Sequence, residues 1–267
     1  MTYSSSFKNL VKESNNKTFI GLGNPNSKIL IVGKEVSTDV TSKKPIEIQN
    51  TITYKRNQKD WAINIENKIS QKDIENWIFD ENALAENIEN NPLFAFKGAI
   101  KKTTSSTWKK YQKLHDSIFQ GGINKNNNIP LTFQEDFFIT EMSNSPSPKT
   151  KNAQNKKAFK AELALRKKEF FKSSYIQNFP VVVLACSNYI LNSKKERQID
   201  EIFGVEFDFD KKYGKGEYFF TKYNRFWVHY NQNATKLVIH TRQLSNNVSD
   251  EMLIEMGEII KQHLNKK

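Results

Sequence analysis

The sequence Ile29-Leu30-Ile31-Val32-Gly33-Lys34-Glu35 decides the fold of this chain of 267 residues. Four apolar residues, three of them β-branched, run without a break and give way to a glycine and two charged residues. Such a run is too short for a buried helix, so it predicts a buried strand of a parallel sheet. In open α/β sheets, ligands bind beyond the carboxyl ends of the strands. We therefore expect Glu35 at the floor of a binding crevice.

Three further apolar runs, at residues 137–140, 180–186 and 236–240, have the same character. Segments with helical periodicity lie between them and after the last of them. Alternation of strands and helices predicts an α/β fold with three layers, α/β/α, around a central, mostly parallel four-stranded sheet. We expect residues 1–267 to form one domain. Residues 201–230 are rich in aromatic side chains and glycine, which predicts a hairpin or bent strands.

The polar segment 36–60 shows few periodic signals and is too long for an ordinary loop of a compact domain. We expect it to be functional or to become ordered on a ligand. Residues 61–69 and 73–88 carry helical patterns, and so does the basic stretch 154–172.

The formal net charge is +12, and a basic surplus is typical of proteins with a polyanionic partner. Of this surplus, +7 lies between Lys149 and Lys172, where nine basic residues stand against Glu162 and Glu169. The stretch is a candidate phosphate-facing surface. The alternative is a helix whose charged face is only solvated.

Cys186 is the only cysteine, which excludes an internal disulfide, a multi-cysteine zinc site and a four-cysteine iron–sulfur cluster. No apolar stretch approaches the roughly 20 residues of a membrane span, and the first residues lack the apolar segment of a secretory signal. Gly21-Leu22-Gly23 precedes the first strand and lacks a third glycine, so it is not a dinucleotide fingerprint. We expect a cytoplasmic monomer without a cofactor or a metal ion.

Polar side chains follow all four predicted strands. Glu35 follows the first, Glu141 and Asn144 the second, Asn188 the third and His240 the fourth. Parallel strands bring these residues to one edge of the sheet, where two carboxylates and an imidazole predict an acid–base site. The alternatives are structural, because Glu35 could cap a helix and His240 could be a bonded core histidine.

With these residues in view, the chain resembles the uracil-DNA glycosylase superfamily. That family carries Gly-Gln-Asp-Pro-Tyr-His after its first strand, where this chain has Gly33-Lys34-Glu35-Val36-Ser37-Thr38. It carries His-Pro-Ser-Pro-Leu-Ser after its last strand, where this chain has His240-Thr241-Arg242-Gln243-Leu244-Ser245. The middle strand of the family commonly ends in an Asn that reads uracil, and the corresponding residue here is Glu141.

The resemblance implies a monofunctional, metal-independent DNA glycosylase that acts on a flipped base in double- or single-stranded DNA. It implies that Glu35 orients water and stabilises the sugar cation, and that His240 hydrogen-bonds the departing base. Leu244 would wedge into the base stack. Base recognition is expected from Glu141, Asn144 and Asn188. The remaining residues expected at DNA are polar or basic: Arg242, Ser245, Ser147, Lys149 and Lys151.

The departures from the family pattern have chemical consequences. Glu35 is one methylene longer than the family's Asp, and some relatives place the carboxylate where this chain has Lys34. An ionised Glu141 would only accept hydrogen bonds. We therefore expect a modified base rather than uracil as the substrate. The alternatives are a binding module of the same fold that recognises a nucleotide or nucleic acid without cleaving it, and a different α/β hydrolase or transferase.

Overall fold

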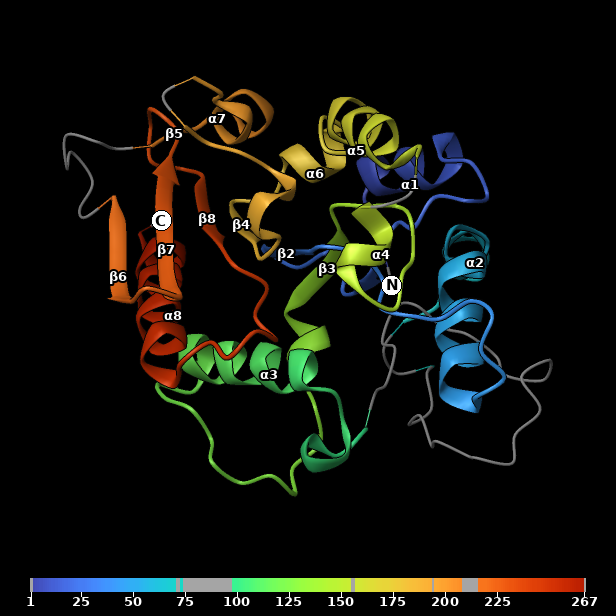
Figure 1. Cartoon of the computed structure of the whole chain (residues 1–267), viewed down its shortest axis with the longest axis horizontal. Helices are drawn as coiled ribbons and strands as arrows, with labels where there is room; N and C mark the ends of the chain where they lie inside the picture. The colour runs from blue at the N-terminus through green and yellow to red at the C-terminus, as the bar shows by residue number, and fades with distance from the viewer. Residues whose placement is uncertain are drawn as a thin grey trace.

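The computed structural model describes residues 2–70, 73, 98–154, 157–193, 195–207 and 216–266. It is a mixed α/β structure in which helices flank a central sheet (Figure 1). Apart from Asp73, the predicted helix at 73–88 lies outside the described residues. No helix in the described part of the chain has the length and apolar character needed to cross a membrane.

The elements alternate along the chain much as the apolar runs predict. The helices are α1 (Ser5–Glu13), α2 (Pro45–Glu66), α3 (Ser106–Phe119), α4 (Thr150–Gln154), α5 (Phe159–Lys168), α6 (Ser174–Gln177), α7 (Gln198–Phe203) and α8 (Asp250–Asn265). The strands are β1 (Leu22–Gly23), β2 (Ile29–Gly33), β3 (Phe137–Glu141), β4 (Val181–Leu184), β5 (Glu206–Phe207), β6 (Glu217–Thr221), β7 (Asn224–Tyr230) and β8 (Leu237–Thr241). A short 3-10 helix at Ser187–Tyr189 follows β4.

The sheet has the order β1-β3-β2-β4-β8-β7-β5, and β6 pairs with β7. The four predicted strands are β2, β3, β4 and β8, and they are adjacent and parallel. The prediction of a four-stranded sheet is wrong, because the described residues form a sheet of eight strands. The added strands are antiparallel: β1 pairs with β3, and the aromatic segment folds into strands that extend the sheet beyond β8. Strand β7 thereby pairs the backbone groups that β8 would otherwise expose at an edge.

Both faces of the sheet are buried, because successive side chains of a strand point to opposite faces. Ile29 and Ile31 pack in the core that α3 and α8 cover. Leu30 and Val32 pack in the core on the other face, under α1, α2, α5, α6 and α7. This arrangement explains why β2 is apolar at every position and ends in a glycine.

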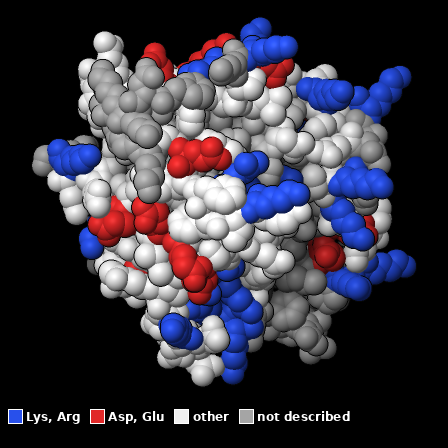
Figure 2. Space-filling model, turned by 60° about the vertical axis from the view of Figure 1, so that its left-hand side comes forward, with Lys and Arg blue, Asp and Glu red and all other residues white. Residues whose placement is uncertain are grey.

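The basic charge is distributed unevenly over the surface. Figure 2 shows Lys and Arg side chains in separate groups, with Asp and Glu side chains between several of them. The net charge of +12 therefore does not form one continuous basic surface on that face.

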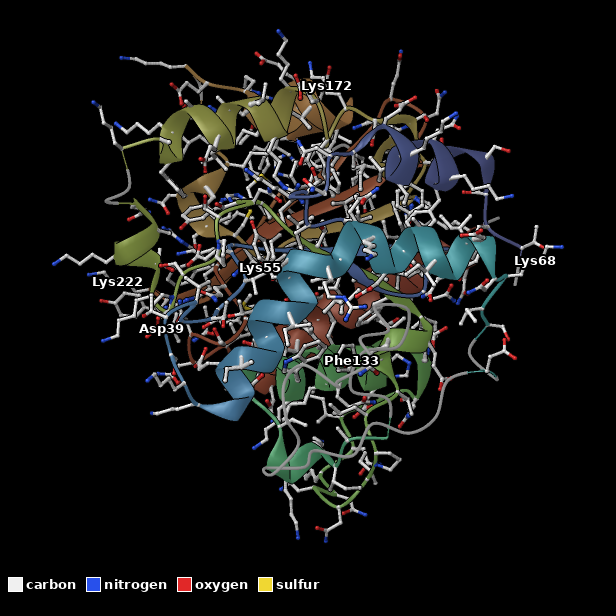
Figure 3. All side chains as sticks on the ribbon, turned by 90° about the vertical axis from the view of Figure 1, so that its right-hand side faces the viewer. Asp39, Lys55, Lys68, Phe133, Lys172 and Lys222 are labelled. Atoms are coloured by element: carbon white, nitrogen blue, oxygen red, sulfur yellow. The ribbon has the colours of Figure 1, made fainter. Side chains whose placement is uncertain are left out.

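Most of the polar segment 36–60 is helical, although its sequence shows few periodic signals. Helix α2 begins at Pro45, has Glu47 in its first turn, and includes residues from the predicted helix at 61–69. Figure 3 shows it running along one side of the molecule, with Lys55 on it. The buried side chain of Asn57 accepts hydrogen bonds from the backbone N–H groups of Ile20 (2.8 Å) and Gly21 (3.1 Å). The helix thus buries polar side chains against a loop, and apolar periodicity cannot reveal such a contact.

The α3–α8 contact depends on a glycine. A Cβ added to Gly257 of α8 would lie 2.5 Å from Cβ of Ser117 in α3. We expect Gly257→Ala to lower the free energy of unfolding by about 1–3 kcal/mol through overpacking, although the same change usually stabilises an exposed helix. Urea denaturation measures the effect. Gly122→Ala is the matched control, since a Cβ there meets no atom within 4 Å; equal stability of the two variants would contradict the prediction.

Candidate active site

The ends of β2 and β3 bring Glu35 and Glu141 together. Gly33 is the register partner of Glu141, and a Cβ on Gly33 would lie 2.2 Å from Oε2 of Glu141. The two segments stay paired beyond the strands, because the N–H of Ser143 donates to the carbonyl oxygen of Lys34 (2.7 Å). The glycine therefore leaves the space that the Glu141 carboxyl group occupies.

Glu35 is buried, with 7% of its surface exposed. Its Oε1 accepts a hydrogen bond of 2.8 Å from the hydroxyl of Thr150, the first residue of α4. The buried ring of Tyr189 lies on the same side, and burial together with the charge of Glu35 raises the pKa of its hydroxyl. Nζ of Lys34 lies 5.3 Å from the centre of that ring. The loop after β4 and helix α4 thus enclose the carboxylate of Glu35.

Glu141 lies in surroundings that favour its protonated form. Burial and, to a smaller extent, the negative charge of Glu35 raise the pKa of Glu141 to about 8, while Arg166 acts in the opposite direction. The carboxyl group of Glu141 is therefore mostly protonated at neutral pH. A protonated carboxyl can donate one hydrogen bond and accept others.

Arg166 of α5 anchors the end of β3. Its Nε donates to the carbonyl oxygen of Glu141 (2.9 Å), and its Nη2 donates to the carbonyl oxygen of Phe19 (2.8 Å) and to Oγ1 of Thr140 (3.1 Å). Burial lowers the pKa of the guanidinium group to about 9. Its Cζ lies 3.8 Å from the centre of the Phe170 ring.

Arg166 belongs to the candidate phosphate-facing stretch, but its helical spacing with Phe159 and Phe170 predicts that it lies on the packed face of that helix. The structure buries this side chain, as the spacing predicts, whereas its hydrogen bonds at the end of β3 could not be predicted from the sequence. An available signal was that Arg166 is the only arginine in a stretch of lysines and has Phe170 four residues later. Arginine is the cation suited to several fixed hydrogen bonds and to an aromatic face.

Three buried polar atoms of this cluster make no hydrogen bond of good geometry with the described residues: Oε2 of Glu35, Oε2 of Glu141 and the hydroxyl oxygen of Tyr189. The Tyr189 hydroxyl nevertheless lies close enough to the Glu35 carboxyl group to interact with it, so Oε2 of Glu141 is the atom with no partner in the described cluster. A buried polar group without a partner costs about 1–3 kcal/mol. Such atoms gathered at the end of parallel strands indicate a site that binds a polar group.

His240 has a different environment. Its Nε2 lies 2.9 Å from the carbonyl oxygen of Ser187, so Nε2 carries the proton and donates it. The ring lies beside Trp227, with 5.6 Å between the ring centres. Burial lowers the pKa of His240 to about 4, although the bond to Ser187 opposes this shift. The imidazole is therefore neutral at physiological pH, and its Nδ1 can only accept a hydrogen bond.

His240 lines a pocket of about 420 Å³ together with Asn188 and Arg242, and neither Glu35 nor Glu141 lines it. The two carboxylates and the imidazole are connected indirectly, through the segment Ser187–Tyr189. The carbonyl of Ser187 accepts from His240, whereas the ring of Tyr189 lies beside Glu35. Ser187 has a positive φ of 50°, an uncommon backbone conformation that is often found at functional sites.

Three predicted site residues have structural positions instead. The amide of Asn144 is occupied, because its Oδ1 accepts from the N–H of Phe19 (2.7 Å) and its Nδ2 donates to the carbonyl of Lys17 (2.8 Å). Leu244 is 1% exposed in the core under α3 and α8, whereas a wedge must protrude. Ser147 is buried, and its hydroxyl donates to the carbonyl of Lys149. These positions do not match the base-reading, wedge and phosphate-binding roles.

The other predicted contact residues lie at the surface. Asn188, Lys149 and Lys151 are exposed, and Arg242 and Ser245 are partly exposed. Their roles at DNA stay predictions.

Comparisons with protein-family models, curated proteins and solved structures find no match to this chain. The resemblance to the uracil-DNA glycosylase superfamily therefore rests on the residues at the strand ends. Within the described residues, no group of three or more His, Cys, Asp or Glu side chains could hold a metal ion.

The raised pKa of Glu141 predicts a pH-dependent stability. A folded-state pKa of about 8, above the ordinary 4.5, stabilises the fold fully below about pH 4.5, and this contribution is lost as the pH rises through about 8. We therefore expect the wild type to lose stability relative to Glu141→Gln between about pH 5 and pH 9, by a few kcal/mol.

Urea denaturation at several pH values measures this difference. Glu13→Gln is the matched control, because Glu13 is an exposed acid of α1. If the stabilities of the wild type and of Glu141→Gln changed in parallel with pH, the prediction would be wrong and the pKa of Glu141 would not be raised by folding.

Proposed function

We propose that the protein is a hydrolase of N-glycosidic bonds that acts on a flipped base in DNA. The observation that carries this proposal is the pair of buried carboxyl groups at the ends of β2 and β3, one of them held protonated near neutral pH. Pairs of carboxyl groups whose environments separate their pKa values are a general arrangement for cleaving glycosidic bonds. The motif residues around Glu35 and His240 make DNA the proposed substrate.

Each carboxyl group suits one half of the reaction. Cleavage passes through a state with positive charge on the sugar, so an anion beside the sugar stabilises it. Glu35 takes that role: Thr150 holds its Oε1, and its Oε2 makes no hydrogen bond of good geometry with the described residues. Glu141 donates its proton or a hydrogen bond to the departing base, the role first expected of His240.

His240 takes a positioning role in this proposal. A neutral imidazole that donates to the carbonyl of Ser187 fixes the short helix Ser187–Tyr189. That helix ends at the ring beside Glu35. The imidazole thereby acts on the carboxylate through the backbone.

An ionised Glu141, which would only accept hydrogen bonds, would disfavour uracil. Burial beside Glu35 instead keeps this carboxyl mostly protonated at neutral pH. A protonated Glu141 can donate and accept, as the amide of Asn does. Uracil and modified bases are therefore both substrates to test.

Binding without cleavage is the second candidate function. It is favoured by the position of His240. The only N–H of its neutral ring is bonded to the carbonyl of Ser187, and neither Glu35 nor Glu141 lines the pocket that His240 lines. Release of a free base separates the two functions.

The test is a base-release assay on oligonucleotides that carry uracil, modified bases or normal bases. We expect Glu35→Gln and Glu141→Gln each to slow release at least about 100-fold, with folding checked by circular dichroism. Wild-type activity should also fall as the pH rises above about 8, where Glu141 loses its proton. Lys8→Ala, a change at an exposed residue of α1 outside the candidate phosphate-facing stretch, should leave the rate unchanged.

Failure to release any base would overturn the hydrolase proposal and leave the binding function. Release that persists undiminished in Glu35→Gln would show that the carboxylate pair is not the catalytic site.

A further inference from the structure

A second site lies between the β6–β7 hairpin and the segments that follow β4 and β8. We call it the hairpin pocket. It has a volume of about 420 Å³. Its lining includes basic, aromatic and amide side chains, namely Asn192, Lys222, Tyr223, Arg225, Trp227 and Arg242.

The charge of the hairpin pocket is positive. Lys222, Arg225 and Arg242 line it, and none of its described lining residues is acidic. The ion pair between Arg225 and Glu217 is long, at 3.7 Å, and both side chains are nearly half exposed, so it leaves the cation accessible. Figure 3 shows Lys222 at the outer edge of the molecule. Such a group of cations fits a phosphate-bearing ligand.

Aromatic rings stand among these cations. Tyr223 is 63% exposed, and Lys222 and Arg242 each lie 5.6 Å from the centre of its ring. The guanidinium carbon of Arg225 lies over the ring of Trp227, 4.9 Å from the ring centre. An exposed ring beside basic groups offers a stacking surface to a planar base while the cations meet the phosphates.

The hairpin pocket is also held in shape by its own contacts. Arg242 donates from Nη1 to the carbonyl oxygen of Tyr223 (2.9 Å), and Thr241 donates from its hydroxyl to the carbonyl oxygen of Arg225 (3.0 Å). These bonds tie the hairpin to the end of β8, and an organised site pays less conformational entropy on binding. Oδ1 of Asn192 is buried without a partner among the described residues, and it can accept from the edge of a base.

We propose that the hairpin pocket binds one nucleotide of a single DNA strand, with its base against Tyr223 or Trp227 and its phosphates at Lys222, Arg225 and Arg242. A single strand is favoured over a duplex because the face of a paired base is covered by its neighbours in the stack. The inference rests on the proposed function only for the choice of DNA, since none of these residues belongs to the carboxylate pair.

Fluorescence anisotropy with a labelled oligo-dT of about 12 nucleotides tests the proposal, beside a duplex of the same length. We expect the single strand to bind more tightly, with an affinity that falls as salt rises. Tyr223→Ala should weaken binding about 10-fold and Tyr223→Phe should not, because stacking needs the ring rather than the hydroxyl.

Arg225→Ala should weaken binding. It should also make the slope of log affinity against log salt concentration less steep, by the amount expected for about one phosphate contact. Lys8→Ala is the matched control, because it removes the same charge from an exposed residue of α1 that lies outside both the hairpin pocket and the candidate phosphate-facing stretch. Its affinity should stay within about twofold of the wild type, as expected for a charge that contacts no phosphate.

Three results would overturn the proposal: tighter binding of the duplex, equal weakening by Lys8→Ala and Arg225→Ala, or unchanged binding in Tyr223→Ala. Base release, measured on single strands of the same length that carry uracil, modified bases or normal bases, separates this proposal from the proposed function. Binding that depends on Tyr223 without base release supports the hairpin pocket and overturns hydrolysis. Base release with unchanged binding in Tyr223→Ala supports hydrolysis and overturns the hairpin pocket.

Discussion

The parallel register of β2 and β3 is the constraint on which the candidate site depends. It sets Gly33 beside Glu141, and the missing side chain of Gly33 leaves room for the carboxyl group. Two residues later the chain reaches Glu35, so two acidic side chains are buried near each other. Burial of Glu141 and, to a smaller extent, the negative charge of Glu35 favour the protonated form of Glu141. The raised pKa of Glu141 is thus a consequence of strand pairing.

The surroundings of this pair combine distant parts of the chain. Arg166 of α5 bonds the backbone at the end of β3, and Thr150 of α4 bonds Glu35. Tyr189 belongs to the short helix that His240 holds from β8. The basic and aromatic hairpin pocket lies on the His240 side of that helix. The fold therefore places the Glu35–Glu141 pair and the cationic hairpin pocket on either side of one short backbone segment. Under the proposed function, the pocket would contact the DNA strand and the pair would act on one of its bases.

Much of the central sheet could be predicted because a strand buried on both faces must be apolar at nearly every position. The four parallel strands have that property, and they are the four that apolar runs identified. The exposed strand β6 and the two-residue strands β1 and β5 lack it, so the antiparallel additions escaped prediction as sheet members. The part of helix α2 before Trp61 was not predicted, because it is polar. Its buried Asn57 accepts hydrogen bonds from backbone groups of Ile20 and Gly21, a contact between segments far apart in the chain.

The sequence by itself determined the apolar strands, the basic surplus and the polar residues that stand at each strand end, because these depend only on the order of residues along the chain. Only the tertiary structure decided which of those residues are neighbours. It paired Glu35 with Glu141, directed the N–H of His240 to Ser187, and buried Leu244 and Arg166. The physical reason is that protonation, hydrogen bonding and exposure depend on distances through space, and those distances are set by how strands and helices pack.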